Sequence, residues 1–216
     1  NKLTDKLFDK LKGDIFNTMN QVMAESYSEE DMAKLGKIIF ERCTDNKTYS
    51  KVYAQIYKDL ADNFPFLRQA FTNSYNSFKE LFNNIEFVEP EVNYDKFCEN
   101  NKKNEKSRSL AAFYVNLMTN GVISNVQLMT ITRDLLAQIY SFISIENKKN
   151  EVDELTETIS ILYKKEIYED DEGDDYEQIN GYTINEIIER IASSKVKDFK
   201  SLTNKSLFKF MDLIEM

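Results

Sequence analysis

Apolar residues recur every three or four positions along most of the chain, most clearly from Ser107 to Ile143. This spacing places them on one face of a helix with roughly 3.6 residues per turn. Gly121 can take the left-handed conformation that ends a first helix, and Ser124 with Gln127 has the spacing of a capping box that starts a second. The stretch therefore predicts one antiparallel helix pair. The side chains expected in its core are Leu110, Phe113, Tyr114, Leu117, Met118, Leu128, Ile131, Leu135, Ile139 and Phe142, and those expected to face water are Arg133 and Gln138.

A short device at helix starts recurs along the chain: an apolar residue, a Ser or Thr that can cap, and a second apolar residue four positions further on. It occurs at Leu3–Phe8, Tyr27–Met32, Ile123–Leu128, Tyr182–Ile187 and Leu202–Leu207. Further helices are predicted at about 4–22, 28–43, 49–62, 65–85, 152–167, 183–191 and 203–214. No strand-like alternation competes with them.

The predicted helix pairs begin near residues 4, 49, 107, 149 and 203. These intervals are about the 40–47 residues of HEAT-type repeats, stretched in places. The pattern therefore predicts an all-α fold, a right-handed α-α superhelix (solenoid) of about five stacked antiparallel HEAT-type helix pairs. A globular helical bundle is the alternative.

Two polar segments interrupt the periodic pattern. We interpret 86–105 as a surface insertion between helix pairs and 169–178 as an acidic loop. The acidic loop lacks the alternating carboxylates of an EF-hand, so a solvated loop is favoured over a calcium site. Residues 1–216 are expected to form a single domain, and the first residue, Asn1, indicates a fragment of a longer protein.

Composition narrows the possible chemistry. The chain has no His, which removes the commonest general base and zinc ligand, and its few Gly residues form no phosphate-binding loop. Cys43 and Cys98 are the only cysteines, so a framework of several disulfides is excluded. We therefore predict no catalytic residues, no metal, no cofactor and no enzyme activity.

Net charge bears on the expected partners. A net charge of −9 argues against a broad nucleic-acid or membrane surface, and no apolar run reaches the roughly 20 residues that span a bilayer. A local basic group could still meet RNA phosphates or an acidic protein surface, the alternative being a solvated loop and helix start. Its members are Lys102, Lys103, Lys106 and Arg108. Abundant Asn, Lys, Ile and Tyr suggest an AT-rich genome, as in a protist or a large virus.

Five motifs lie in order along almost the whole chain. They are Asn1 to Thr4 with Phe8, Ile39 to Cys43, Tyr49 to Leu60, Arg108 to Met118, and Phe210 to Ile214. Together they resemble the middle domain of eukaryotic translation initiation factor 4 gamma. The insertion at 86–105 is shorter and less charged than in the animal members, and the acidic loop is peculiar to this chain.

The resemblance implies a non-enzymatic HEAT-repeat scaffold that holds a DEAD-box RNA helicase and bridges its two RecA-like lobes. The implied helicase-binding residues are Leu3, Phe8, Arg108, Ser109, Phe210 and Asp212. The first two would lie at one lobe and the last two near the other. As alternatives, Leu3 and Phe8 form only a helix-start staple, and Phe210 belongs to the core.

The resemblance also implies a cellular setting. RNA and a cap-binding protein would be reached through regions outside this chain, without a membrane. The expected location is the cytoplasm, meaning the host cytoplasm or a viral factory if the protein is viral. The alternative function is an RNA-binding or other mRNA-metabolism adaptor of the same fold, as in nonsense-mediated decay or a poly(A)-binding-protein partner.

Overall fold

Helices form the regular structure of the chain. The computed structural model describes residues 5–25, 28–45, 47–72, 85–165, 167 and 179–215. Within these ranges, extended backbone pairs only at an isolated antiparallel bridge between Ile179 and Tyr182. The all-α prediction is therefore confirmed.

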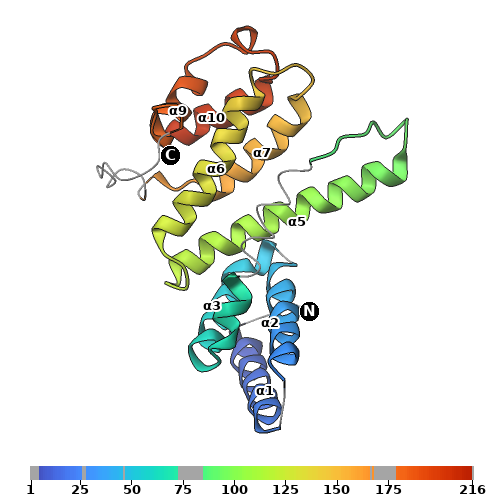
Figure 1. Ribbon diagram of the computed structural model, residues 1–216, viewed down its shortest axis with the longest axis vertical. Coiled ribbons are helices and arrows are strands. Elements are labelled where there is room, and N and C mark those ends of the chain that lie inside the picture. The colour runs from blue at the N-terminus through green and yellow to red at the C-terminus, as the bar shows by residue number, and fades with distance from the viewer. Residues whose placement is uncertain are drawn as a thin grey trace.

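The N-terminal helices form one group at the lower end of the molecule (Figure 1). The group contains α1 (Asp5–Ala24), α2 (Glu29–Thr44), the 3₁₀ turn η1 (Lys47–Tyr49), α3 (Ser50–Asn63) and a helical segment at 66–72. The first three helices begin within one or two residues of their predicted starts. The predicted fourth helix is seen at 66–72, and its continuation lies outside the described residues until residue 85, which is not helical.

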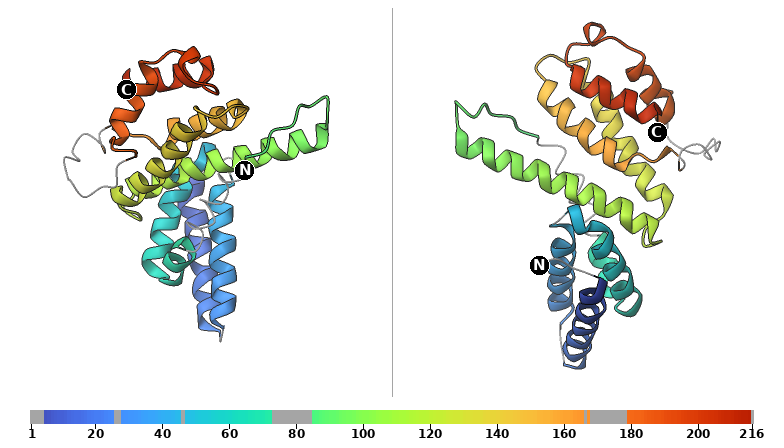
Figure 2. Two further views of the ribbon diagram at one scale, coloured as in Figure 1. Left: turned by 45° about the horizontal axis from the view of Figure 1, so that its top comes forward. Right: turned by 180° about the vertical axis from the view of Figure 1, so that it is seen from behind.

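The remaining helices lie above this group. They are α5 (Tyr94–Thr119), α6 (Asn125–Phe142), α7 (Lys149–Leu162), α9 (Ile184–Ala192), the 3₁₀ turn η2 (Val196–Asp198) and α10 (Asn204–Glu215). The 26-residue α5 crosses the molecule between the two groups, with α3 packed on one side and α7 on the other (Figures 1 and 2). In turn, α10 packs against α7 and α9. The extensive contacts thus join α3 to α5, α5 to α7, and α7 to both α6 and α10.

An aromatic cluster joins α5 to the N-terminal group. Phe40 of α2, Tyr57 of α3, Phe71 of the 66–72 segment and Phe113 and Tyr114 of α5 are all buried. Their ring centroids lie 5.3–6.5 Å apart, mostly in edge-to-face geometry. Such pairs contribute about 0.5–1.5 kcal/mol each beyond the burial of their surface. The cluster therefore fixes the centre of α5 on the lower helices.

The turn between α5 and α6 has the predicted chemistry. Gly121 has φ +70°, and the amides of Gly121 and Val122 donate to the carbonyls of Met118 and Leu117 at 2.9 Å. Ser124 and Gln127 then bond reciprocally as a capping box. α6 diverges from α5 beyond this turn, and α7 rather than α6 packs more extensively against α5.

The segment 86–105 departs from the prediction. Only residues 85–93 are non-helical, because α5 already begins at Tyr94. The Asn93 side chain caps it by accepting a hydrogen bond from the Lys96 amide at 2.9 Å, and Glu99 pairs with Lys103 at 2.8 Å one turn apart. The first half of α5 projects from the body (Figures 1 and 2), and most of its side chains are exposed, although Asn100 is buried and Phe97 and Cys98 are half-buried. This half has few apolar residues, so periodicity could not reveal it.

Two expected features lie outside the described residues. The acidic loop 169–178 is one of them, and the start of the chain up to Thr4 is the other. The structure accordingly gives no position for Leu3.

Candidate docking surfaces

Of the two residues expected near one helicase lobe, Phe8 lies in the first turn of α1. Leu3 is outside the described residues, and Phe8 is half-buried and packs against the core. An ion pair between Lys12 and Asp59 ties α1 to α3. Phe8 therefore helps to hold α1, which lies at the lower end of the molecule (Figure 1), and its side chain is only partly buried.

Arg108 and Ser109 are both engaged within the protein, so neither presents a free side chain for the expected helicase contact. Arg108 Nη1 donates a hydrogen bond to Glu154 Oε2 of α7 at 2.5 Å, and both side chains are largely buried. Ser109 is buried. From Ser107 onward, α5 is covered on most sides by its neighbours, so these two residues help to hold α5 on α7.

α10 exposes three large apolar side chains. Phe208, Met211 and Ile214 are three positions apart and lie along one side of the helix, which we call the α10 stripe. Phe208 is 61% exposed. Asp212, one of the expected helicase contacts, is also exposed. Phe210 is fully buried, so its predicted contact is wrong and its core alternative holds.

Polar contacts with α7 fix the orientation of α10. Glu157 pairs with Lys205 at 3.2 Å and Lys209 at 3.1 Å, and Asp153 accepts a hydrogen bond from the Thr203 hydroxyl at 2.5 Å. Burial alone would raise the pKa of Glu157, but hydrogen bonds from Lys209 and Lys205 bring this pKa below its ordinary value. The α10 stripe is thus held outward by a network on the opposite side of the helix.

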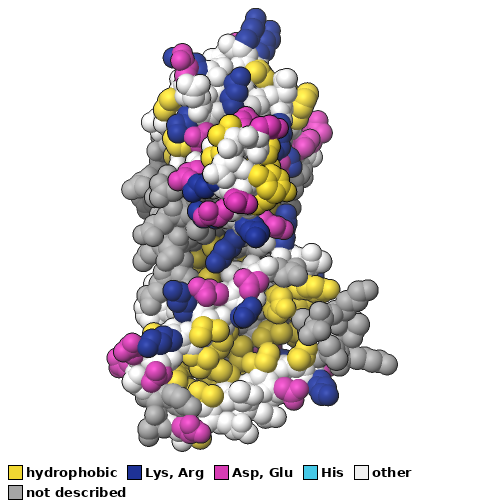
Figure 3. Space-filling model, turned by 90° about the vertical axis from the view of Figure 1, so that its right-hand side faces the viewer, with side chains coloured by type: hydrophobic (Ala, Val, Ile, Leu, Met, Phe, Trp, Pro, Cys, Tyr) yellow, Lys and Arg dark blue, Asp and Glu magenta, His cyan; other side chains and the backbone are white. Residues whose placement is uncertain are grey.

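A second apolar area lies at the other end of the molecule. Figure 3 shows apolar side chains gathered over the lower half, which the α1–α3 group forms. Apolar surface therefore occurs near both ends of the long axis, close to the two regions expected to meet the helicase lobes.

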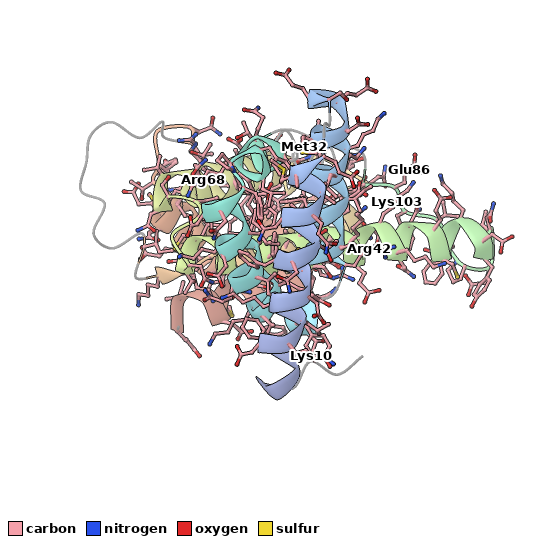
Figure 4. The ribbon with its side chains drawn as sticks, turned by 90° about the horizontal axis from the view of Figure 1, so that it is seen from below. Lys10, Met32, Arg42, Arg68, Glu86 and Lys103 are labelled. Atoms are coloured by element: carbon pink, nitrogen blue, oxygen red, sulfur yellow. The ribbon has the colours of Figure 1, made fainter. Side chains whose placement is uncertain are left out.

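The basic group is smaller than predicted. Lys102, Lys103 and Lys106 are exposed on the projecting half of α5, whereas Arg108 is engaged by Glu154. Lys103 pairs with Glu99 at 2.8 Å. Figure 4 also shows Lys103 beside Glu86. Among the described residues, neither Lys102 nor Lys106 has an ion-pair partner. Two lysines without an ion-pair partner in the described part of the chain can neutralise about two phosphates, which is a weak basis for RNA binding.

Groups that could support chemistry are few within the described ranges. Burial raises the pKa of the Cys43 thiol to about 12, so its nucleophilic thiolate is scarce at neutral pH. The described residues contain no group of three or more His, Cys, Asp or Glu side chains placed to hold a metal. A shallow cavity of about 320 Å³ beside α9 includes Tyr182 and Arg190, but the guanidinium lies 4.3 Å above the ring. The Arg190 guanidinium and the Tyr182 ring therefore contact each other and do not face a ligand in this cavity.

Sequence reasoning missed Phe208 and Met211 as surface residues. The buried set Leu207, Phe210 and Leu213 has the same three-residue spacing as the exposed set. Periodicity identifies a helix but gives no preference between two apolar faces about 100° apart. The sequence signal for an exposed apolar face was the number of apolar residues in this helix, which exceeds what one buried face needs.

Comparison with known proteins identified no relative of this chain. No protein-family model, curated protein or solved structure matches the chain. Within the described residues, every helix is too short or too polar to cross a membrane.

Proposed function

We propose that this chain is a non-enzymatic translation-initiation scaffold that binds a DEAD-box RNA helicase and promotes its ATP-dependent cycle. The ordered motifs support this proposal, and so does their place in an all-helical chain. Phe40, Leu110, Leu117 and Phe210 belong to those motifs and are buried. The proposal includes the finer fold, a solenoid of about five HEAT-type pairs. The succession of packed helices from α3 through α5 and α7 to α10 favours it.

The observation that carries the proposal is the α10 stripe. Three exposed apolar side chains on a well-anchored helix, flanked by Asp212, form the kind of rigid apolar patch that marks a protein-docking site. α10 lies at the opposite end of the molecule from α1 (Figure 1). Two contact regions far apart suit a partner built from two lobes.

The mechanism is a shift between conformations of the helicase. A rigid scaffold that touches one lobe through α1 and the other through α10 binds a half-open arrangement better than a splayed one. The increase in cycling rate is limited by the difference in the scaffold's affinity for these two arrangements. The scaffold itself needs no catalytic group, and we place this function in the cytoplasm.

An ATPase assay with purified DEAD-box helicases tests the proposal. The chain alone should hydrolyse no ATP but should stimulate its cognate helicase. The double variant Phe208→Ser with Met211→Ser should lose most of the stimulation. A matched double variant, Val126→Ser with Ile145→Ser, removes exposed apolar side chains elsewhere and should stimulate normally. Neither binding nor stimulation with several helicases, or full stimulation by the stripe variant, would contradict the proposal.

The alternative function is an RNA-binding adaptor in mRNA metabolism. It is favoured by Lys102 and Lys106, which are exposed on the projecting half of α5. It predicts RNA binding that weakens as salt rises and is lost on charge reversal of these two lysines. RNA binding that survives this change would exclude the lysines as the site.

A further inference from the structure

The projecting end of α5 carries an acidic loop tip, residues 86–95, which we call the acidic finger. Its sequence mixes apolar and acidic residues and contains four carboxylates without Lys or Arg. Val92 is 79% exposed and Tyr94 is 66% exposed, and Phe87 is also exposed. The finger lies away from the helical body in all three ribbon views (Figures 1 and 2).

Hydrogen bonds hold the tip in one conformation. The Val92 amide donates to the Glu89 carbonyl at 3.0 Å, which closes a turn with Pro90 at its second position. The Asn93 amide donates to the same carbonyl at 3.2 Å. Proline restricts the backbone at this position, so the turn is favoured before any partner binds.

The base of the acidic finger is tied to α5. Glu86 pairs with Lys96 at 2.8 Å, and the hydrogen bond from Lys96 lowers the pKa of Glu86. The Tyr94 ring lies 6.4 Å from the Phe97 ring, centroid to centroid. The exposed apolar side chains are thus presented on a preformed support, which reduces the entropy lost on binding.

The charge of the acidic finger selects among partners. Glu89, Glu91 and Asp95 are exposed, and no ion pair joins them to another described residue. Their charge repels nucleic-acid phosphates and anionic lipid headgroups, whereas it attracts Lys and Arg side chains. The exposed Val92 and Tyr94 require an apolar contact at the same place. A protein groove with a basic rim and an apolar floor satisfies both requirements.

We propose that the acidic finger is a second docking element, which inserts Val92 and Tyr94 into an apolar pocket with a basic rim on a partner protein. This site is separate from the α10 stripe and does not depend on the helicase proposal. Its removal should leave helicase stimulation unchanged.

Selection from a random-peptide library on the whole chain tests this inference. The enriched peptides should combine Lys or Arg with large apolar residues. They should bind the double variant Val92→Ser with Tyr94→Ser about tenfold or more weakly, because both apolar contacts are lost. The variant Val126→Ser with Ile145→Ser is the matched apolar control and should bind as wild type.

Charge reversal supplies the second arm of the experiment. Glu89→Lys with Glu91→Lys should weaken peptide binding and reduce its salt dependence. Glu41→Lys with Glu189→Lys makes the same change of net charge elsewhere on exposed helix surface and should have little effect. Three results would overturn the inference: no enriched peptide, peptides that bind the finger variants normally, or finger-dependent binding to phosphatidylserine vesicles instead.

Discussion

Glycine-to-alanine substitution at two helical positions should have opposite effects on stability. Gly13 lies in α1 with open space around it, and a Cβ built there meets nothing within 4 Å. Gly36 lies in α2 against the 66–72 segment, where a Cβ would lie 2.6 Å from the Cβ of Ala70. The chemical change is the same at both sites, so the difference reports helix packing.

The expected magnitudes follow from two opposing terms. Alanine favours a helix interior over glycine by about 1 kcal/mol, and this gain applies at both positions. At Gly36 the new methyl must also be accommodated, since carbon atoms pack best at about 3.5–4.0 Å. Ala70 has no flexible side chain that could move aside, so the two helices must separate, at the roughly 1–3 kcal/mol typical of overpacked cores. Gly13→Ala should therefore exceed Gly36→Ala in stability by about 1–3 kcal/mol.

Urea unfolding followed by circular dichroism measures this difference. Gly13→Ala should raise the unfolding midpoint, and Gly36→Ala should leave it unchanged or lower it. In an Ala70→Gly background the clash is absent, so Gly36→Ala should then stabilise about as much as Gly13→Ala does. A Gly36→Ala variant at least as stable as Gly13→Ala would refute the close packing of α2 on the 66–72 segment.

Three further predictions concern α5, α7 and α10. Leu110→Ala should lower the free energy of unfolding in urea by about 2–5 kcal/mol, because the side chain is buried; a loss near zero would place it on the wrong face. A double-mutant cycle of Arg108→Gln and Glu154→Gln should give a coupling energy of about 1 kcal/mol, and additive losses would deny the ion pair. The folded-state pKa of Glu157 lies below its ordinary 4.5. The carboxylate therefore contributes to the free energy of unfolding above pH 4.5, and this contribution is lost as the pH falls through the folded-state pKa. Acid titration of stability should therefore be shallower in Glu157→Gln below pH 4.5, and an unchanged slope would contradict this.

Helix starts and ends were the part of the fold most open to prediction. Ser124 with Gln127, Thr183 with Glu186, and the left-handed Gly121 all have their expected geometry. Each depends on hydrogen bonds between residues three to five positions apart, which a sequence displays directly.

Long-range packing was less accessible from the sequence. Arg133 was expected to face water, yet its side chain is largely buried. The projecting half of α5 has few apolar residues, and a capping side chain and ion pairs support its exposed side. Which face of α10 is buried depends on α7 and α9, and those contacts cannot be read from α10 itself. Ser109 and Phe210 are buried and Arg108 is bonded to Glu154 for the same reason, since each meets neighbouring helices.

Calorimetric titration of a cognate DEAD-box helicase into the chain tests the central claim most directly. The claim is that this helical chain docks a two-lobed partner through surfaces that include the α10 stripe. We predict saturable binding to wild type, with affinity at least about tenfold weaker for Phe208→Ser with Met211→Ser and unchanged for Val126→Ser with Ile145→Ser. Equal affinity for wild type and the stripe variant, or no binding by any DEAD-box helicase, would contradict it.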